Sequence, residues 1–194
     1  MNFRPLVLLA LCLSLPGCII FDKKSESVTF HQLNAPQAFP TVKGPAIFIP
    51  RVQLPSALRR PTLVLIDEAG NVRLEDSQRW AGPLDRSIAE AIGQHLVQDT
   101  GRPVALQAPS DAHLVLLIDV DQFGLHGETA VLQVHFRVEN DAGQLLAQGQ
   151  GTWNSPKAGN PEGFVRAQSE NLAKAADIIG KVLAPLTPQS GKTR

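Results

Sequence analysis

The pattern that most constrains the fold is a segment in which apolar residues occupy every second position. It runs from Thr129 to Glu139, and a period of two is typical of a strand with one buried face. Asp141-Ala142-Gly143 follow as turn residues, and strand-forming residues resume from Leu145 to Trp153. A long antiparallel hairpin is therefore expected, and its apolar face needs a second layer to cover it. The residues of that face are Ala130, Leu132, Val134, Phe136 and Val138.

Two segments can supply this layer, because their apolar residues recur at helical spacing. The first helix is predicted over residues 83–100, with Pro83 at its start and Gly101 at its end. The second helix is predicted over residues 162–183 and is stopped by Pro185. The apolar stripe of the second helix consists of Phe164, Leu172, Ala175, Ile179 and Val182.

Shorter apolar runs predict the remaining strands. A second hairpin is expected where residues 62–67 and 72–75 flank a turn at 68–71. Hairpins that alternate with helices predict a single α/β domain with a mixed sheet of about five strands flanked by helices. The length of 194 residues and the hydrophobic content of 43% are enough for one such core. Further strands are expected at 28–33, 46–54, 104–107 and 113–123.

The first seventeen residues have the composition of a secretory signal peptide, with Arg4 before an apolar run from Pro5 to Leu15. The eleven residues of this run reach about 16 Å as a helix, against about 30 Å of hydrocarbon, so the run is too short to span a bilayer. Leu15-Pro16-Gly17-Cys18 resembles a bacterial lipobox, whose cysteine is acylated and begins the mature chain. The alternative is a plain secretory signal that contains a cysteine.

Cysteine usage agrees with acylation of Cys18. Cys12 lies inside the signal peptide, and residues 19–194 contain no cysteine that could form a disulfide. Two or three acyl chains anchor a protein stably, and Ile19 in place of Asp favours the outer membrane. The expected boundaries are a signal peptide at 1–17, the lipidated cysteine and a tether at 18–27, a domain at 28–186 and a polar tail at 187–194.

Charge and composition exclude several classes of partner. Lys+Arg and Asp+Glu both number 18, so the formal net charge is zero and no basic face for nucleic acid is expected. Tyr is absent, which also argues against a platform for stacking bases. Ser190-Gly191-Lys192-Thr193 looks like the end of a phosphate-binding loop, but Leu186 stands where that loop needs a glycine.

Catalytic and metal-binding residues are not expected. His113, Asp119 and Asp121 share strand parity and can form one polar face, but a metal site needs further ligands, and neither HExxH nor paired cysteines supply them. No GxSxG motif occurs, and Cys18 is acylated in this interpretation. We therefore predict solvated strand positions, no metal, no cofactor and no enzymatic activity. An anchored hydrolase that uses these three residues is the weakest alternative.

The most distinctive local segment is Arg79-Trp80-Ala81-Gly82-Pro83-Leu84. A Trp directly before a helix can pack as a staple between the hairpin and the helix, and Arg79 can pair with Glu75 or Asp76. Alternatively, Trp80 is an exposed anchor for a partner. The candidate residues for a partner site or a structural staple are Arg79, Trp80, Pro83 and Leu84.

The same segment resembles the RW-x-x-PL signature of the ABC-type transport auxiliary lipoprotein family, which includes PqiC. The resemblance extends over the mature chain through the lipobox, the pair Pro50-Arg51 after an apolar strand, the Arg60-Pro61 hairpin and the C-terminal hairpin and helix. Gly82 departs from the family, whose members often carry an acidic residue there. The resemblance implies a five-stranded mixed sheet flanked by helices, and no shared catalytic residues.

For function, the resemblance implies an auxiliary or docking lipoprotein of an MCE-type, PqiABC-like lipid transport system that supports membrane integrity. Its implied partners are a periplasmic MCE-domain protein and, in many systems, an ABC transporter or a PqiA-like membrane protein. A homo-oligomer is also compatible with the sequence. The alternative is a periplasmic lipoprotein that itself binds a lipid or another amphiphile as a shuttle or chaperone. A tether of at most about 30 Å holds the domain near its membrane, so transport would need a bridging partner.

Replacing the lipobox cysteine tests the anchor. We expect Cys18→Ala to release the protein into the soluble periplasmic fraction and to abolish function, because the acyl chains are the membrane anchor that the sequence predicts. Membrane fractionation measures the outcome. Variant protein that stays in the outer membrane would contradict the predicted anchor.

Overall fold

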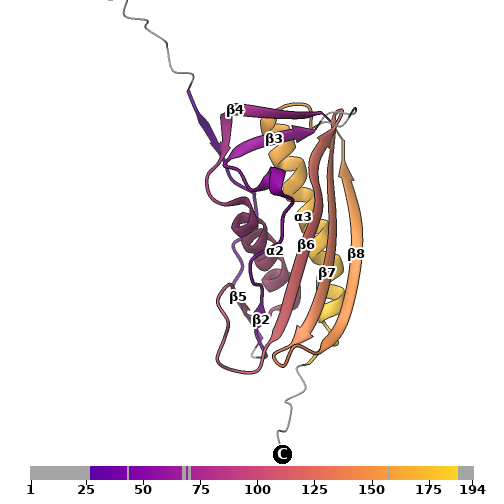
Figure 1. The fold of residues 1–194 in the computed structure, drawn as a ribbon. Helices are drawn as coiled ribbons and strands as arrows, with labels where there is room; N and C mark the ends of the chain where they lie inside the picture. The colour runs from indigo at the N-terminus through magenta and orange to yellow at the C-terminus, as the bar shows by residue number, and fades with distance from the viewer. Residues whose placement is uncertain (1–26, 43, 67–68, 70, 157, 188–194) are drawn as a thin grey trace, which may run out of the picture.

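A five-stranded mixed sheet forms the larger layer of the structure (Figure 1). The computed structural model describes residues 27–187 apart from residues 43, 67–68, 70 and 157. The predicted signal peptide, Cys18 and the predicted tail from residue 188 onward lie outside the described residues. In spatial order the strands are β5 (Val104–Ala105), β2 (Ile47–Phe48), β6 (Leu114–His126), β7 (Thr129–Asn140) and β8 (Leu145–Ser155).

The strand directions confirm the predicted mixed sheet. Strands β5 and β6 run parallel to β2, which lies between them, whereas β6, β7 and β8 form an antiparallel meander. The apolar face predicted for β7 is buried, and none of its five residues is more than 2% exposed. Gly143 in the following turn has φ 78°, a left-handed conformation that glycine adopts without a steric penalty.

Helices α2 (Leu84–Thr100) and α3 (Pro161–Leu183) contact each other, and α3 also lies along β7 and β8 (Figure 1). Both predicted helices are confirmed. Pro83 precedes the first helical residue, and Gly101 ends α2 with φ 67°, as expected for a glycine at a helix C-terminus. At the start of α3 the side chain of Asn160 accepts a hydrogen bond of 2.7 Å from the backbone N–H of Gly163, a capping contact that stabilises a helix.

The hairpin near the N-terminus belongs to a separate, smaller sheet. Strands β3 (Thr62–Ile66) and β4 (Val72–Trp80) form the expected hairpin, and β1 (Thr29–His31) pairs in parallel with the end of β4. The sequence predicted the strand only as far as Glu75, whereas β4 continues to Trp80. Its last residues have few apolar side chains, and their strand conformation is supported by pairing with the distant β1 and by contacts with Pro61 and Thr62.

Buried amide side chains join α3 to the larger sheet. Gln168 and Asn171 are both 0% exposed. The side-chain amide of Gln168 donates to the backbone carbonyls of Val131 (2.9 Å) and Gly124 (3.3 Å). The side-chain amide of Asn171 donates to the backbone carbonyl of Ala130 (3.2 Å). Because buried polar groups are costly when unpaired, these bonds permit only one placement of α3 along the sheet.

Removing one of these amides should lower stability. We expect Gln168→Leu to reduce the free energy of unfolding by about 1 to 3 kcal/mol, because two buried carbonyl groups lose a donor. Urea denaturation of the variant measures the difference. Glu170→Gln, on the exposed side of the same helix, is the matched control and should leave stability nearly unchanged. Equal stability of Gln168→Leu and the wild type would contradict the role assigned to Gln168.

Candidate functional site

Trp80 occupies the junction between the smaller sheet, the larger sheet and α2. Its side chain is 5% exposed, and its ring meets that of Phe123 in β6 edge to face with centroids 6.0 Å apart. Phe123 in turn meets Phe164 of α3 at 5.8 Å. The backbone N–H of Trp80 donates to the carbonyl of Pro61 at 2.7 Å. The aromatic chain thus fixes the end of β4 against the core just before α2 begins.

Arg79 does not make the ion pair that the sequence suggested. It is exposed at the end of β4, and Glu75 instead pairs with the Nε of Arg73 at 2.7 Å. The reason is strand geometry: residues two apart share a face and lie about 7 Å apart, whereas residues 75 and 79 are about 13 Å apart along the strand. The positive charge of Arg79 therefore remains at the surface.

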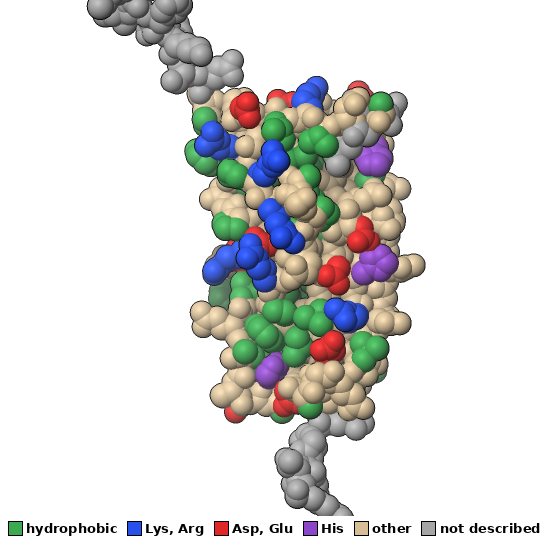
Figure 2. Space-filling model, in the orientation of Figure 1, with side chains coloured by type: hydrophobic (Ala, Val, Ile, Leu, Met, Phe, Trp, Pro, Cys, Tyr) green, Lys and Arg blue, Asp and Glu red, His purple; other side chains and the backbone are tan. Residues whose placement is uncertain are grey.

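Three segments that are distant in the sequence line one groove, which we call the α2 groove. It consists of two adjoining depressions of about 310 and 410 Å³ that share Arg51, Pro83 and Asp85. Pro50-Arg51, Arg60-Pro61 and the segment Trp80 to Leu84 all contribute to its walls. Figure 2 shows basic side chains beside hydrophobic ones on this face of the molecule. The remaining lining residues are Ile49, Leu54, Leu58, Arg59, Asp85, Arg86, Ala89 and Leu106.

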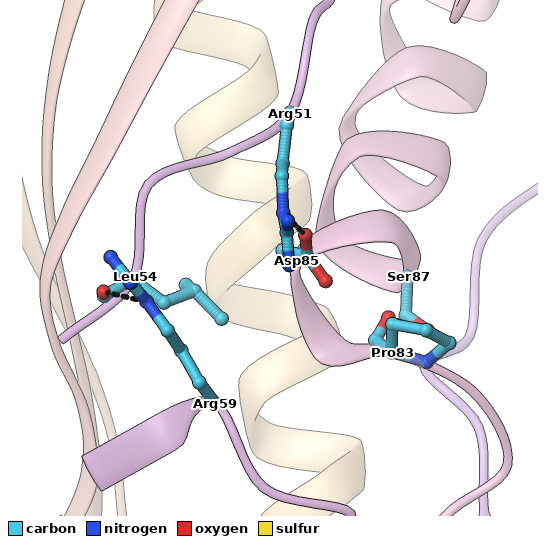
Figure 3. A network of polar contacts seen from close by, with 6 residues as sticks. All are labelled: Arg51, Leu54, Arg59, Pro83, Asp85 and Ser87. Atoms are coloured by element: carbon cyan, nitrogen blue, oxygen red, sulfur yellow. Dashed lines mark hydrogen bonds and ion pairs between the residues drawn. The ribbon is translucent and has the colours of Figure 1, made fainter. Parts of the chain in front are cut away.

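Polar contacts hold the side chains of the α2 groove in place (Figure 3). The Nε of Arg51 pairs with the carboxylate of Asp85, which is 13% exposed and lies in the first turn of α2. A carboxylate is favourable there because the helix dipole is positive at its N-terminus. The Nε of Arg59 donates to the carbonyl of Leu54 at 3.0 Å.

The α2 groove is positively charged although the whole chain is neutral. Arg51, Arg59 and Arg60 line the larger depression, and Asp85 is its one carboxylate among the described residues. In the smaller depression Arg86 also lines the wall and pairs with Glu90 at 2.9 Å. The site can therefore attract an anionic group.

The sequence identified part of this site and missed the rest. Of the four candidate residues, Trp80, Pro83 and Leu84 line the α2 groove, whereas Arg79 is not among its lining residues. Arg59 and Asp85 were not singled out, and nothing in the linear sequence indicated that residues 51, 59–60 and 80–85 would meet. The available signal was compositional, since Arg51, Arg59 and Arg60 fall within ten residues.

The three polar residues considered for chemistry are not brought together. Asp119 and Asp121 line a depression of about 620 Å³ with His135, whose Nε2 lies 2.7 Å from the carboxylate of Asp121. His113 lies six residues before Asp119, about 20 Å along the strand direction, and its Nδ1 is 2.8 Å from the carbonyl of Asp111. Within the described part of the chain, no group of three or more His, Cys, Asp or Glu side chains is arranged to hold a metal ion.

Truncating Trp80 distinguishes its two predicted roles. We expect Trp80→Ala to lower the free energy of unfolding by about 3 to 5 kcal/mol, the usual cost of removing a buried aromatic ring. Thermal or urea denaturation measures this loss. The half-buried Trp153 offers a control, and Trp153→Ala should cost less. A Trp80→Ala protein of unchanged stability with partner binding weakened by about 2 kcal/mol or more would instead identify an interface anchor.

Comparison with known proteins places the chain in a family. The family described as ABC-type transport auxiliary lipoprotein component matches residues 31–180. No curated protein sequence matches the chain significantly. No helix in the described ranges is both long enough and apolar enough to cross a membrane.

Two solved structures share the fold at low sequence identity. A crystal structure of an uncharacterised protein aligns with 81% of this chain and 99% of its own, at 17% identity and a TM-score of 0.71. A DUF330 protein from Xanthomonas campestris aligns with 79% of this chain and 93% of its own, at 15% identity and a TM-score of 0.65. PelC from Paraburkholderia phytofirmans, crystallised as a dodecamer, aligns with 82% of this chain and 97% of its own, at 17% identity and a TM-score of 0.41. With the family description covering residues 31–180, this chain belongs to the ABC-type transport auxiliary lipoprotein component family.

Proposed function

We propose that the protein is an outer-membrane lipoprotein that docks a periplasmic MCE-domain protein of a lipid transport system. Membership of the auxiliary lipoprotein family supports a role in transport. The observation that carries the docking role is the α2 groove, in which Arg51, Arg59 and Arg60 line one open depression that three separate segments form. In this proposal the acylated Cys18 holds the domain at the membrane and the groove faces the partner.

The shape of the described cavities favours docking over lipid carriage. A lipid shuttle needs an enclosed, largely apolar pocket that buries most of its ligand. The depressions of the α2 groove are open to solvent, and the depression of about 620 Å³ is lined by Asp119, Asp121, His135 and Arg137 among other residues. Neither of these sites offers acyl chains an interior in the described part of the protein. We therefore place lipid binding by this domain second to docking.

Self-association is part of the same proposal. Strand β8 ends the order of the five-stranded sheet, so one of its edges has no partner strand among the described residues. It is eleven residues long and contains neither charged residues nor proline, the features that commonly prevent edge strands from pairing. A second copy of the chain can therefore pair there, and light scattering of the purified protein measures the resulting mass.

Purification of the acylated, full-length protein from membranes tests the docking role. We expect the MCE-domain protein of the same organism to co-purify in a fixed ratio. We also expect deletion of either gene to cause the same sensitivity to detergent, and deletion of both to cause no greater sensitivity, because the two proteins act in one pathway.

Bound lipid provides the contrary outcome. Mass spectrometry of the same preparation should find no lipid in equimolar amount beyond the acyl chains of Cys18. One equivalent of a bound lipid, together with the absence of the MCE-domain protein, would favour the shuttle and contradict the docking role.

A further inference from the structure

We infer that the α2 groove binds an acidic, extended segment of the transport partner, with carboxylates of that segment seated on Arg51, Arg59 and Arg60. This inference rests on the proposed docking function and specifies which surface makes the contact and which chemistry it recognises. It combines the excess of positive charge in the groove, the choice of arginine over lysine and the position of the groove on the domain.

The basic residues of this region are of one kind. Between residues 44 and 156 the sequence contains no lysine, and six of its eleven arginines fall between Arg51 and Arg86. A guanidinium group presents five N–H donors in a planar fork that matches the two oxygens of a carboxylate, whereas a lysine ammonium is a point charge. The composition therefore favours a ligand whose anionic groups accept two parallel hydrogen bonds, as carboxylates and phosphates do.

The arginines of the groove keep donors available for such a ligand. Arg51 and Arg59 each use their Nε in the contacts described above, with Asp85 and with the carbonyl of Leu54. Each guanidinium has four further N–H donors on its terminal nitrogens. The ion pair between Arg51 and Asp85 already shows how a carboxylate sits against one of these arginines (Figure 3).

The smaller depression gives the segment an apolar contact beside the charged one. Ile49, Ala89 and Leu106 line it, and Leu106 is 36% exposed. An acidic segment that also carries an apolar side chain would place that side chain here. Burial of its apolar area stabilises the complex whatever the orientation of the side chain. The carboxylates then provide the orientation, since charged contacts fix register and exclude wrong partners.

The position of the groove favours a protein segment over a membrane surface. The groove is a concave site on the flank of the domain, at the start of α2, whereas β1 begins near the end of the domain that carries the β3–β4 hairpin (Figures 1 and 2). A flat bilayer at that end cannot enter a concave groove on the flank. An extended chain, which advances about 3.3 Å per residue, can follow it.

Charge reversal in the groove tests the inference. The probe is the full-length MCE-domain protein in detergent, titrated against the full-length, acylated protein. We expect Arg59→Glu combined with Arg60→Glu to weaken the dissociation constant by at least about tenfold, because attraction becomes repulsion. Arg59→Lys combined with Arg60→Lys keeps the charge but loses the planar fork, and an intermediate weakening is expected.

Matched controls separate this surface from general charge effects. Arg137→Glu combined with Arg166→Glu makes the same change in net charge at exposed positions of β7 and α3 and should leave the dissociation constant unchanged. Thermal denaturation should show that all variants are folded, since Arg59 and Arg60 lie at the surface of the groove. Wild-type binding should also weaken as the salt concentration rises, because carboxylate–arginine attraction is screened.

Three outcomes would overturn the inference, and they have different consequences. Equal binding by the wild type and the Arg59→Glu, Arg60→Glu variant would remove the groove from the interface but leave the docking function standing. If the Arg59→Glu, Arg60→Glu variant lost the binding to phosphatidylglycerol vesicles that the wild type shows, but still bound the MCE-domain protein, the arginines would be assigned to lipid headgroups. Absence of any binding between the wild type and the MCE-domain protein would overturn both the inference and the proposed function.

Discussion

The hydrogen bonds from the amides of Gln168 and Asn171 to the backbone of β6 and β7 are the constraint on which the rest of the structure depends. They place α3 at one position along the sheet, and that position brings Phe164 against Phe123 and Phe123 against Trp80. Trp80 in turn fixes the end of β4 and the start of α2. Buried polar contacts of α3 are thus linked, through this aromatic chain, to a groove formed mainly by residues 49–89.

The α2 groove has two levels with different physical roles. Beneath it lie buried apolar side chains, such as Leu54, Leu84 and Trp80, whose contacts stabilise the fold. Above them lie arginines such as Arg51, whose side chain is 75% exposed. Exposed ion pairs contribute about 0 to 1 kcal/mol to stability, so the arginine side chains can change with little effect on folding. Substitution of these arginines would therefore change the charge of the groove while the fold beneath it stays the same.

Local patterns predicted most of the fold correctly. The alternation in β7, the helical spacing in α2 and α3 and the glycine at position 101 each depend on neighbours within a few residues, and the structure confirms them. The separate three-stranded sheet was not predicted, because β1 and β4 pair across about fifty intervening residues and no local pattern encodes that pairing. Gln168 and Asn171 were missed for a related reason: polar residues in a helix read as solvent-exposed unless their distant carbonyl partners are known.

The candidate site was predictable only in its parts. The segment from Arg79 to Leu84 and the pairs Pro50-Arg51 and Arg60-Pro61 stood out in the sequence, but each did so separately. Their convergence is a property of the tertiary fold, as is the ion pair between Asp85 and Arg51. The sequence search for catalytic motifs also depended on local patterns alone. Family membership supports a transport role for the chain.

The parallel pairing of β1 with β4 gives the domain a defined mechanical path. Residues 29–31 pair with residues 78–80. The chain enters this sheet at the start of β1, and after the end of β4 it continues directly into the segment that lines the groove. A tension applied between the N-terminal segment and the groove would pull these two strands in opposite directions along their length. The hydrogen bonds between them would then be loaded together rather than one after another, which is the geometry that resists separation best. The three-stranded sheet therefore lies where a force between the start of β1 and the groove would be carried.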